Sequence, residues 1–554
     1  MPMPAFTPCS APRRLLEEGG YADAVDLHDA AHAAELERVL ASTRAPLALM
    51  QAAGLAVARL ARAMTPHARR VRVLAGPGNN GGDGFEAAAR LKADWPDVHI
   101  DLAWLGHPAS QPGDAAASRL RAEAAGVAIT ELDHPPTGAA DRLATWCAEL
   151  AQADGDTLVI DALLGRGLNR PVSGDLARLI DALNTGAARV LSVDLPSGLN
   201  GDVGVWPDGV DAPIVRADTT LALLSPSPGL CTGMGRDVVG ELWWHDLGTG
   251  SATPHAVAAQ ARLARGSALA RLLQPRPHRQ HKGSVGDLWV IGGDVAMQGA
   301  AWLAARAALE CGAGRVHVDL LDAQGLGLDP GQPELMVGRC ADRDELARAT
   351  VIAGCGGGPA IAARLPELLS TTARLVLDAD ALNAIARDTN LQDRLRERSA
   401  RGQASVLTPH PLEAARLLGS DVAAVQADRL AAVRALATSY RCTALLKGSG
   451  TLVCSASSGA LPTINGSGNA ALATPGSGDV LAGVIGAFWS QLAIRPLVEE
   501  GPGDDAATLA TRAAVDLHGR VAQSMSHRGA ALPASRLVSG LGDWLRRQAP
   551  PRSA

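Results

Sequence analysis

The feature that most constrains the fold is a regular alternation of short β-rich runs with longer Ala-, Leu- and Arg-rich segments of helical period. In the first half of the chain the β-rich runs lie at residues 71–75, 99–102, 157–160 and 189–193. In the second half they lie at residues 287–291, 315–318, 350–353, 375–377, 405–407 and 443–446. Strand–helix–strand alternation predicts mostly parallel sheets covered by helices.

The alternation lapses once, in a stretch rich in Gly, Ser, Thr and Pro between Gly248 and Pro277. Such composition is typical of a connecting segment. We therefore predict two α/β domains, residues 1–250 and residues 278–554, joined by a linker at residues 251–277. A chain of 554 residues is long enough for two large domains at roughly 100 to 200 residues or more each.

The charge balance limits the classes of partner. Acidic residues number 57 against 51 basic ones, which gives a formal net charge of −6. Nucleic acids and anionic membranes attract strongly basic surfaces, so we expect neither as a partner.

The cysteines and the apolar segments indicate the compartment. The eight cysteines are scattered without a CxxC pair, which argues against a zinc site or disulfide framework and fits a reducing cytosol. The first twenty residues contain no apolar run of seven or more, so we expect no signal peptide. The nearest candidate for a membrane span, residues 480–494, is short and is interrupted by Ser490 and Gln491. We therefore expect a cytoplasmic protein.

A glycine-rich loop follows the first predicted strand and reads Gly76-Pro77-Gly78-Asn79-Asn80-Gly81-Gly82-Asp83-Gly84. Its first, third and sixth residues match the G-x-G-x-x-G dinucleotide pattern, and Asp101 lies near the expected offset. The free N–H groups of such a loop at a helix start suit a phosphate. Its side-chain amide and carboxylate oxygens also suit a cation.

Two further loops place oxygen-bearing side chains at predicted strand ends. Residues 160–168 carry Asp161, and residues 192–202 carry Asp194 and Ser197. Ligand sites of open α/β sheets form at strand ends, and hard cations need several oxygens. Each loop alone is equally consistent with an ordinary capped turn. Three such loops in one domain favour a binding site.

The strings GPGNNGGDG, DALLGRGL and SVDLPSGLNGD, in this order, resemble the N-terminal domain of the YjeF family, an NAD(P)H-hydrate epimerase. The resemblance covers residues 27–247. It implies a Rossmann-like three-layer αβα sandwich that holds a potassium ion and interconverts the R and S hydrates of NADH and NADPH. Asn80, Asp161 and Ser197 are then the expected potassium ligands.

The same resemblance assigns the substrate contacts. Asp194 is the expected proton-transfer group, because epimerising C6 of the hydrate needs acid–base assistance. Family members often carry a threonine where this chain has Arg166. The expected contacts to the hydrated dinucleotide are Asn79, Asn80, Gly81, Gly82, Asp83, Gly165, Arg166, Gly167, Leu168, Asn169, Arg170, Pro171 and Asp194.

The second half carries a sharper motif, Gly476-Ser477-Gly478-Asp479, before an apolar helix. Stacked N–H groups there suit a transferring phosphoryl group, and Asp479 is placed to accept a hydroxyl proton. The alternative is a helix that Ser477 or Asp479 merely caps, although a cap does not explain the two flanking glycines. Lys447-Gly448-Ser449-Gly450-Thr451 follows a predicted strand and suits a nucleotide phosphate, but no Walker A loop occurs.

Three further strings complete the second half. His410 lies between two prolines on a stiff turn, which favours a substrate contact over the commoner structural role. Cys355 is the one cysteine in a ligand-like loop, residues 354–358. A strand and then a helix that starts with small residues, residues 297–301, follow the string His281-Lys282-Gly283-Ser284-Val285-Gly286.

In combination these strings resemble the C-terminal domain of the YjeF family over residues 280–487. That resemblance implies a ribokinase-like αβα domain with NAD(P)H-hydrate dehydratase activity, and the whole chain resembles the bifunctional repair enzymes of bacteria. Such enzymes use ADP, here expected with Mg²⁺, and release AMP and phosphate. Phosphorylation makes the C6 hydroxyl a good leaving group, and Asp479 is the expected catalytic base.

The resemblance also assigns the remaining residues. Where the family has a Gly-Pro-Gly-Leu-Gly-like loop, this chain has Gly-Cys-Gly-Gly-Gly at residues 354–358. The hydrate is expected to contact Ala300, Gly358, His410 and Asp479. The nucleotide is expected to contact Lys447, Gly448, Ser449, Gly450, Thr451 and Gly478, with an anion hole formed by Gly476, Ser477 and Gly478.

Two other interpretations stay open at this point. One is an ATP-dependent kinase of a small hydroxymethyl metabolite, which would share the Gly-x-Gly-Asp site. The other is a dinucleotide sensor without turnover, against which the intact Asp194 and Asp479 argue. The expected partners are the small molecules NADHX, NADPHX and ADP, and we expect a homo-oligomer.

Overall fold

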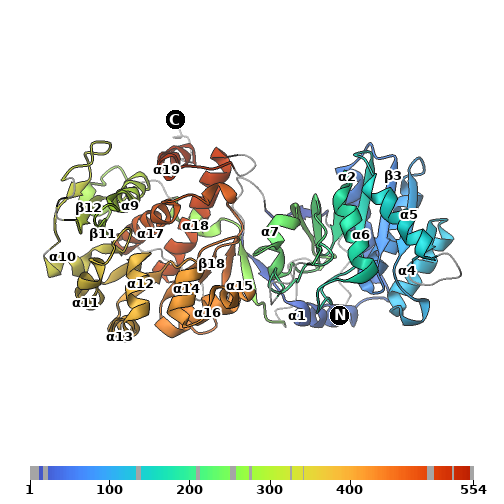
Figure 1. The fold of residues 1–554 in the computed structure, drawn as a ribbon, viewed down its shortest axis with the longest axis horizontal. Helices are drawn as coiled ribbons and strands as arrows, with labels where there is room; N and C mark the ends of the chain where they lie inside the picture. Colours follow the sequence, from blue (N-terminus) through green and yellow to red (C-terminus); the bar gives the residue numbers. More distant parts are fainter. Residues whose placement is uncertain are drawn as a thin grey trace. The chain divides into compact units, whose positions relative to one another are not determined.

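The computed structural model describes residues 11–16, 23–132, 139–206, 212–249, 257–273, 277–322, 324, 327–340, 342–495, 505–526 and 530–548. The chain divides into two compact units (Figure 1). The first comprises Met1–Glu17 and Asp26–Gln260, and the second comprises Glu18–Val25 and Ala261–Ala554.

The first unit is built around an eight-stranded sheet of order β1-β9-β8-β7-β6-β3-β4-β5. All neighbouring strands are parallel except β1 and β9. Its strands are β1 (Arg13–Arg14), β3 (Arg70–Ala75), β4 (His99–Trp104), β5 (Ala128–Glu131), β6 (Thr157–Ala162), β7 (Arg189–Val193), β8 (Thr219–Leu223) and β9 (Glu241–His245), while β2 (Val25–Leu27) lies outside this sheet. Its helices are α1 (Ala30–Ala41), α2 (Ala48–Met64), α3 (Asn79–Asp94), α4 (Gly113–Ala124), α5 (Ala139–Ala151), α6 (Gly174–Thr185) and α7 (Gly235–Val238).

Helices cover both faces of this sheet. Val71 and Val73 of β3 pack with α2 and α3 in one hydrophobic cluster, whereas Leu74 packs with α5 and α6 in another. Because strand side chains alternate between faces, this division makes the three-layer αβα sandwich that the sequence predicts. The chain runs outward from β3 to β4 and β5, and then returns to place β6 on the other side of β3. The ends of β3 and β6 therefore flank a topological switch point, where α/β sheets bind ligands.

The second unit contains a longer sheet with both faces covered. Ten of its strands follow the order β13-β12-β11-β14-β15-β16-β17-β18-β19-β10, and β18 is antiparallel to both of its neighbours. They are β10 (Ala261–Ala264), β11 (Asp287–Gly292), β12 (Arg315–Leu320), β13 (Met336–Val337), β14 (Thr350–Ala353), β15 (Arg374–Leu377), β16 (Ala404–Leu407), β17 (Thr443–Leu446), β18 (Leu452–Cys454) and β19 (Thr463–Asn465).

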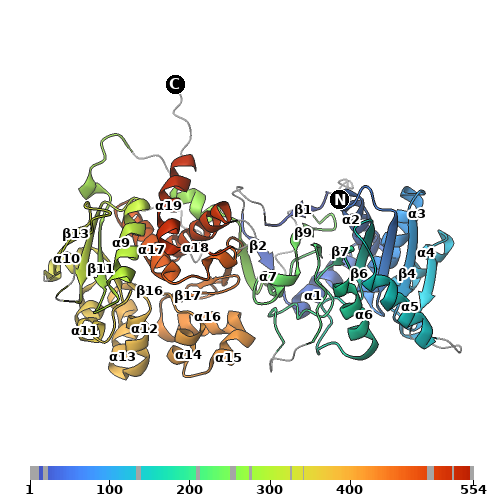
Figure 2. The same ribbon diagram turned by 45° about the horizontal axis from the view of Figure 1, so that its top comes forward.

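The helices of the second unit separate into two layers (Figure 2). Helices α9, α17, α18 and α19 lie on one face, and α11 to α16 lie on the other. The unit contains α8 (Ser267–Leu272), α9 (Gln298–Glu310), α10 (Arg343–Arg348), α11 (Ile361–Thr371), α12 (Asp380–Arg387), α13 (Thr389–Arg398), α14 (Pro411–Leu418), α15 (Val422–Ala427), α16 (Arg429–Tyr440), α17 (Ser477–Ile494), α18 (Ala506–Met525) and α19 (Ala534–Gln548).

Helix α17 is long and apolar enough to cross a membrane by length and composition, but 67% of that stretch is buried inside the protein. Val480, Val484 and Ile485 belong to the main hydrophobic cluster of the second unit. Helix α17 also contacts α9 and α18. Its apolar character therefore matches a core helix.

The segment predicted as a linker contains a strand and a helix. Residues 251–256 and 274–276 of that range lie outside the described residues, but β10 and α8 both lie within it. Strand β10 pairs in parallel with β19, with Arg262 opposite Thr463. The run Ala261–Ala264 is too short to signal a strand by its own periodicity. Its partner lies 201 residues later in the sequence, so the pairing leaves no local signal either.

Candidate functional sites

A cavity of about 660 Å³ opens in the first unit beside the ends of β3, β6 and β7. Glu37 of α1 and Asp114 of α4 also line it. The predicted substrate contacts among its lining residues are Asn79, Asn80, Asp83, Gly165, Arg166, Gly167, Leu168, Asn169, Arg170 and Asp194. Three loops that are far apart in the sequence thus meet at one cavity.

Three predicted contacts, Gly81, Gly82 and Pro171, are not among the residues that line this cavity in the described part of the chain. A Cβ added at Gly81 would lie 2.1 Å from the carbonyl oxygen of Gly76, and one at Gly82 would lie 2.6 Å from the terminal carbon of Met50. Both glycines therefore permit close packing of the loop against its surroundings.

Beside the cavity, Asp161 forms the centre of a buried cluster of oxygen atoms. Its carboxylate accepts hydrogen bonds from the Ser192 hydroxyl (2.8 Å), the Ser197 backbone N–H (2.9 Å) and the Ser197 hydroxyl (2.6 Å). Burial raises the pKa of Asp161, although these hydrogen bonds oppose that effect.

Asn80 joins the cluster from the start of α3. Its Nδ2 donates to the carbonyl oxygen of Leu164 at 3.0 Å, and the Leu164 N–H donates to the Ser197 hydroxyl at 2.9 Å. The Oδ1 atom of Asn80 is buried and has no hydrogen-bond partner among the described residues. A buried acceptor without a donor is costly. The chemistry of this donor set therefore fits a bound cation.

Asp194 follows β7 and points into the same cavity. Its backbone has a φ of +65°, which side-chain-bearing residues rarely adopt. Its carboxylate is paired with Arg166, whose Nη2 lies 2.8 Å from Oδ1 and whose Nε lies 3.0 Å from Oδ2. Burial and the nearby charges of Asp194 and Glu37 raise the pKa of Asp83 well above its usual range. The cavity therefore combines a carboxylate paired with a cation and a carboxyl group that favours its neutral form.

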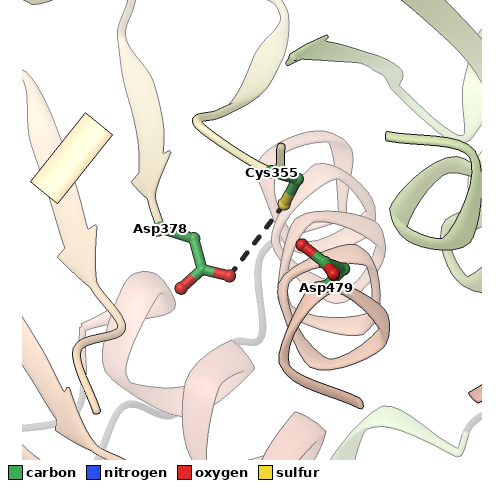
Figure 3. A group of neighbouring side chains, drawn as sticks. All are labelled: Cys355, Asp378 and Asp479. Carbon is green, nitrogen blue, oxygen red and sulfur yellow. Dashed lines mark hydrogen bonds between the residues drawn. The ribbon is translucent and has the colours of Figure 1, made fainter. Parts of the chain in front are cut away.

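In the second unit, Asp479 lies in the first turn of α17 and faces two side chains at strand ends (Figure 3). Asp378 follows β15 and Cys355 follows β14. The side-chain ligand atoms of these three residues lie within 4.8 Å of one another. The Cys355 thiol donates to Asp378 Oδ2 at 4.0 Å.

Lys447, at the end of β17, supplies positive charge to this group. Its Nζ lies 2.5 Å from Asp378 Oδ1, which also accepts a hydrogen bond from the Thr408 hydroxyl at 2.7 Å. Burial opposes its charge, but Asp378 and Glu413 outweigh that effect and raise the pKa of Lys447. A Cβ added at Gly478 would lie 3.1 Å from Lys447 Nζ, so the ammonium group lies beside the start of α17.

The surroundings of Asp479 change the pKa of its carboxyl group. Burial and the negative charge of Asp378 raise the pKa of Asp479 to about 6, whereas Lys447 and a hydrogen bond from Cys355 act in the opposite direction. Burial raises the pKa of the Cys355 thiol well above its usual range, so the thiol remains a proton donor. A carboxyl group that ionises just below neutral pH is suited to general-base catalysis.

The start of α17 carries no side-chain cap in the described structure. Its N-cap is Gly476, with a φ of +87°, and the Ser477 hydroxyl donates instead to the carbonyl oxygen of Leu472 at 2.8 Å. The interpretation of Ser477 or Asp479 as a mere helix cap is therefore wrong. The backbone N–H groups of this turn lie next to Asp479 and are suited to an anion.

His410 caps a helix, whereas its proline neighbours had favoured a substrate contact over a structural role. It is the N-cap of α14, where its Nδ1 accepts from the N–H groups of Leu412 (3.1 Å) and Glu413 (3.4 Å). Burial and Lys447 lower the pKa of His410, and burial raises the pKa of Glu413 to about 7. The ring is half exposed and its Nε2 lies 3.3 Å from Glu413 Oε1.

The other predicted hydrate contacts lie on neighbouring loops. Ala300 is in the first turn of α9, and its Cβ lies 2.9 Å from the position of a Cβ added at Gly356. Gly358 has a φ of +51°, and its N–H donates to Asp380 Oδ2 at 2.9 Å. A Cβ at Gly358 would lie 2.4 Å from Asp294 Oδ2, so only glycine fits between these carboxylates.

The predicted nucleotide segment, residues 447–451, connects β17 to β18. Gly448 has a φ of +130°, and a Cβ there would lie 3.0 Å from the guanidinium of Arg429. The Thr451 hydroxyl donates to the carbonyl oxygen of Gly448 at 3.1 Å. Sequence reasoning did not single out Asp378, Thr408 or Glu413 as functional, although an aspartate directly after the β-rich run at 375–377 was a usable signal.

Comparisons with known proteins agree with this arrangement. Residues 46–229 match the family described as YjeF-related protein N-terminus, and residues 288–541 match the family described as NAD(P)H-hydrate dehydratase. The bifunctional NAD(P)H-hydrate repair enzyme Nnr of Escherichia coli K12 is 36% identical over 454 residues, which are 80% of this chain and 80% of that protein.

Two further similarities extend the comparison. The enzyme of the same name from Coxiella burnetii is 34% identical over 465 residues, which are 82% of this chain and 88% of that protein. A solved structure of the ADP/ATP-dependent NAD(P)H-hydrate dehydratase of Bacillus subtilis, co-crystallised with ATP and Mg²⁺, is 25% identical with a TM-score of 0.39. It covers 51% of this chain and 96% of that chain.

Proposed function

This chain belongs to the family of bifunctional NAD(P)H-hydrate repair enzymes, and from that membership we infer that it converts hydrated NADH and NADPH back to the intact cofactors. The first unit epimerises the R and S hydrates, and the ribokinase-like second unit dehydrates the S hydrate. The observation that carries this assignment best is Asp479 at the uncapped start of α17, beside Lys447 and Asp378.

In the first unit, Asp194 is the proposed group that moves the proton during epimerisation at C6. Its carboxylate lines the cavity and is paired with Arg166, which supports a proton-transfer group held in a fixed orientation. The raised pKa of Asp83, caused by burial and nearby negative charge, supports a proton donor on the same cavity. The loop residues 79–83 and 165–171 are the proposed contacts for the dinucleotide, and most of them line the cavity.

A potassium ion is the proposed occupant of the oxygen cluster beside that cavity. Asn80, Asp161 and Ser197 would hold it, and the buried Oδ1 of Asn80 without a partner among the described residues supports this fit. The ion would supply positive charge that compensates Asp161 and would fix three separate loops relative to one another.

In the second unit, the proposed co-substrate is ADP, bound as its Mg²⁺ complex. Asp479 takes the proton of the C6 hydroxyl while the hydroxyl oxygen attacks the terminal phosphorus of ADP and AMP leaves. The backbone N–H groups of Gly476, Ser477 and Gly478 and the Lys447 ammonium lie where they would stabilise the transferring group. The C6–O bond then breaks with phosphate as leaving group, and loss of a C5 proton restores the dihydronicotinamide.

The remaining contacts complete the proposed site. Ala300, Gly358 and His410 would contact the hydrate, and residues 447–451 together with Gly478 would contact the nucleotide. The enzyme is proposed to act in the cytoplasm as a homo-oligomer. Seven cysteines of the described residues are free thiols, which supports a reducing compartment.

Two substitutions test the assignment of one activity to each unit. In Asp479→Asn, ADP-dependent recovery of the dihydronicotinamide should be lost, while interconversion of the R and S hydrates, followed by chromatography, should continue. In Asp194→Asn the reverse is expected: the S hydrate should still be dehydrated, and the R hydrate should remain unconverted. Loss of both activities in a folded variant would contradict the assignment.

A further inference from the structure

We propose that Arg166 is the positioning residue of the epimerase site and that it holds the Asp194 carboxylate in its working orientation. This proposal rests on the proposed role of Asp194 in epimerisation. It gives Arg166 a task beyond the dinucleotide contact that the sequence predicts, because the guanidinium reaches a carboxylate and two carbonyl groups of its own unit.

Several hydrogen bonds connect the side chains of Arg166 and Asp194. Arg166 Nη2 donates to Asp194 Oδ1 at 2.8 Å, and Nε lies 3.0 Å from Oδ2 and 3.2 Å from Oδ1. Both carboxylate oxygens are thereby held by one planar group. A bidentate arginine–carboxylate pair fixes orientation as well as distance.

Arg166 is itself anchored by hydrogen bonds to two backbone carbonyl groups. Its Nη2 also donates to the carbonyl oxygen of Leu223 at 2.9 Å and to that of Ser225. The Ser225 hydroxyl lies 2.6 Å from His28 Nδ1, so this part of the chain is in turn held from the segment before α1. Arg166 therefore connects Asp194 to the end of β8 rather than reaching freely into the cavity.

The backbone of Asp194 adopts the left-handed conformation. Its φ of +65° is unfavourable for a residue with a side chain, so surrounding contacts must maintain it. The Asp194 N–H donates to the carbonyl oxygen of Leu221 at 2.9 Å. Arg166 adds the corresponding restraint on the side chain, at Leu223 two residues further along β8.

Electrostatics also favours the pair of Arg166 and Asp194. The acidic side chains of Asp83 in α3 and Glu37 in α1 line the same cavity as Asp194, and burial together with the charge of Asp194 raises the pKa of both groups. The side chains of Arg166 and Asp194 are 12% and 15% exposed, so solvent screens their charges little. A half-buried carboxylate near other carboxylates needs a cation to remain in place, and Arg166 supplies it.

The test compares Arg166→Ala and Arg166→Lys in the full-length chain. Epimerisation of purified R hydrate is followed by chromatography without nucleotide, so that dehydration does not contribute. We expect Arg166→Ala to lower kcat by about 100-fold, the loss that a misplaced catalytic group causes, with KM changed much less. Arg166→Lys should recover part of kcat, because an ammonium group can still pair with one oxygen of Asp194.

Two controls establish that any loss is local. Arg178→Ala removes an exposed arginine of α6 that pairs with Asp175 at 3.0 Å outside the cavity, and it should leave epimerisation unchanged. ADP-dependent dehydration of the S hydrate should stay at the level of the parent protein in Arg166→Ala, which reports a folded second unit, and an unchanged urea-unfolding transition should report a folded first unit.

Other results would overturn the proposal. A raised KM with unchanged kcat in Arg166→Ala would make Arg166 a substrate ligand, and unchanged values for both would show that the ion pair has no role. Asp194→Asn distinguishes a failure of the proposed role of Asp194 from a failure of the proposed role of Arg166. If Asp194→Asn epimerises normally, the proposed role of Asp194 fails; if it is inactive while Arg166→Ala is not, the positioning role alone fails.

Discussion

Replacing Cys355 with alanine should shift the pH dependence of dehydration in a predictable direction. Asp479 must be ionised to accept the hydroxyl proton, and its pKa of about 6 means that activity falls as the pH drops through that value. The Cys355 thiol, whose sulfur lies within 4.8 Å of a carboxylate oxygen of both Asp378 and Asp479, favours the ionised form of Asp479. Without the thiol, the pKa of Asp479 should rise and the acid limb of the profile should move to higher pH.

The size of the effect follows from the weakness of a thiol as a donor. Loss of such a hydrogen bond to a carboxylate costs about 0.5–1 kcal/mol, and one pH unit corresponds to about 1.4 kcal/mol, so the acid limb should move by about half a unit. Near pH 6 the ionised fraction would fall from about one half to about one quarter, a twofold loss of kcat/KM that should disappear well above neutral pH.

The assay is kcat/KM for the S hydrate with saturating ADP across the acid limb. Cys355→Ser keeps a hydroxyl donor and should shift the limb less than Cys355→Ala. Cys311→Ala removes another buried thiol, which belongs to the main hydrophobic cluster of the same unit, and should leave the limb in place. An acid limb that does not move in Cys355→Ala, or moves to lower pH, would refute this account of the site.

Three further predictions concern separate parts of the chain. Asp479→Asn should reduce dehydration by about 10²–10⁴-fold, as expected for loss of a general base, measured with S hydrate and ADP; residual activity near that of the parent protein would contradict its role. Exchanging potassium for choline should slow epimerisation in the parent but not in Asn80→Ala, and a parent protein that is indifferent to potassium would rule out the cation site. Gly81→Ala should destabilise the first unit by about 1–3 kcal/mol in urea unfolding, because its Cβ would lie 2.1 Å from the Gly76 carbonyl oxygen. Gly78→Ala should be tolerated, since its Cβ would meet nothing within 4 Å; equal destabilisation by both would contradict the packing argument.

The sequence was sufficient to predict the layered architecture, because its strands and helices have local sequence signals. The β-rich run at 71–75 is β3 within one residue, and the glycine loop after it begins α3. Polar residues that follow such runs do come together as parallel strand order requires: Ser197 hydrogen-bonds to Asp161, and Asp194 lines the cavity beside them.

Side-chain pairs between distant loops could not be predicted from the sequence in the same way. Lys447 and Asp378 are 69 residues apart, and their contact depends on the order of β15, β16 and β17 in the sheet. The family resemblance assigned Arg166 to the dinucleotide, but the geometry of β7 and β8 brings Asp194 and two carbonyl groups within its reach. The helix-capping role of His410 was open to local reasoning, because Glu413 follows three residues later as in a capping box.

The most direct test of the central claim follows the near-ultraviolet absorbance of the dihydronicotinamide from a mixture of R and S hydrates. The mixture is incubated with ADP, with ATP or without nucleotide, and spontaneous epimerisation is measured in parallel. The account predicts that ADP restores the entire mixture faster than spontaneous epimerisation allows. Recovery of the S fraction alone would contradict a working first unit. Absence of recovery with either nucleotide, together with phosphorylation of a small hydroxymethyl compound by ATP, would replace the repair function with that of a kinase.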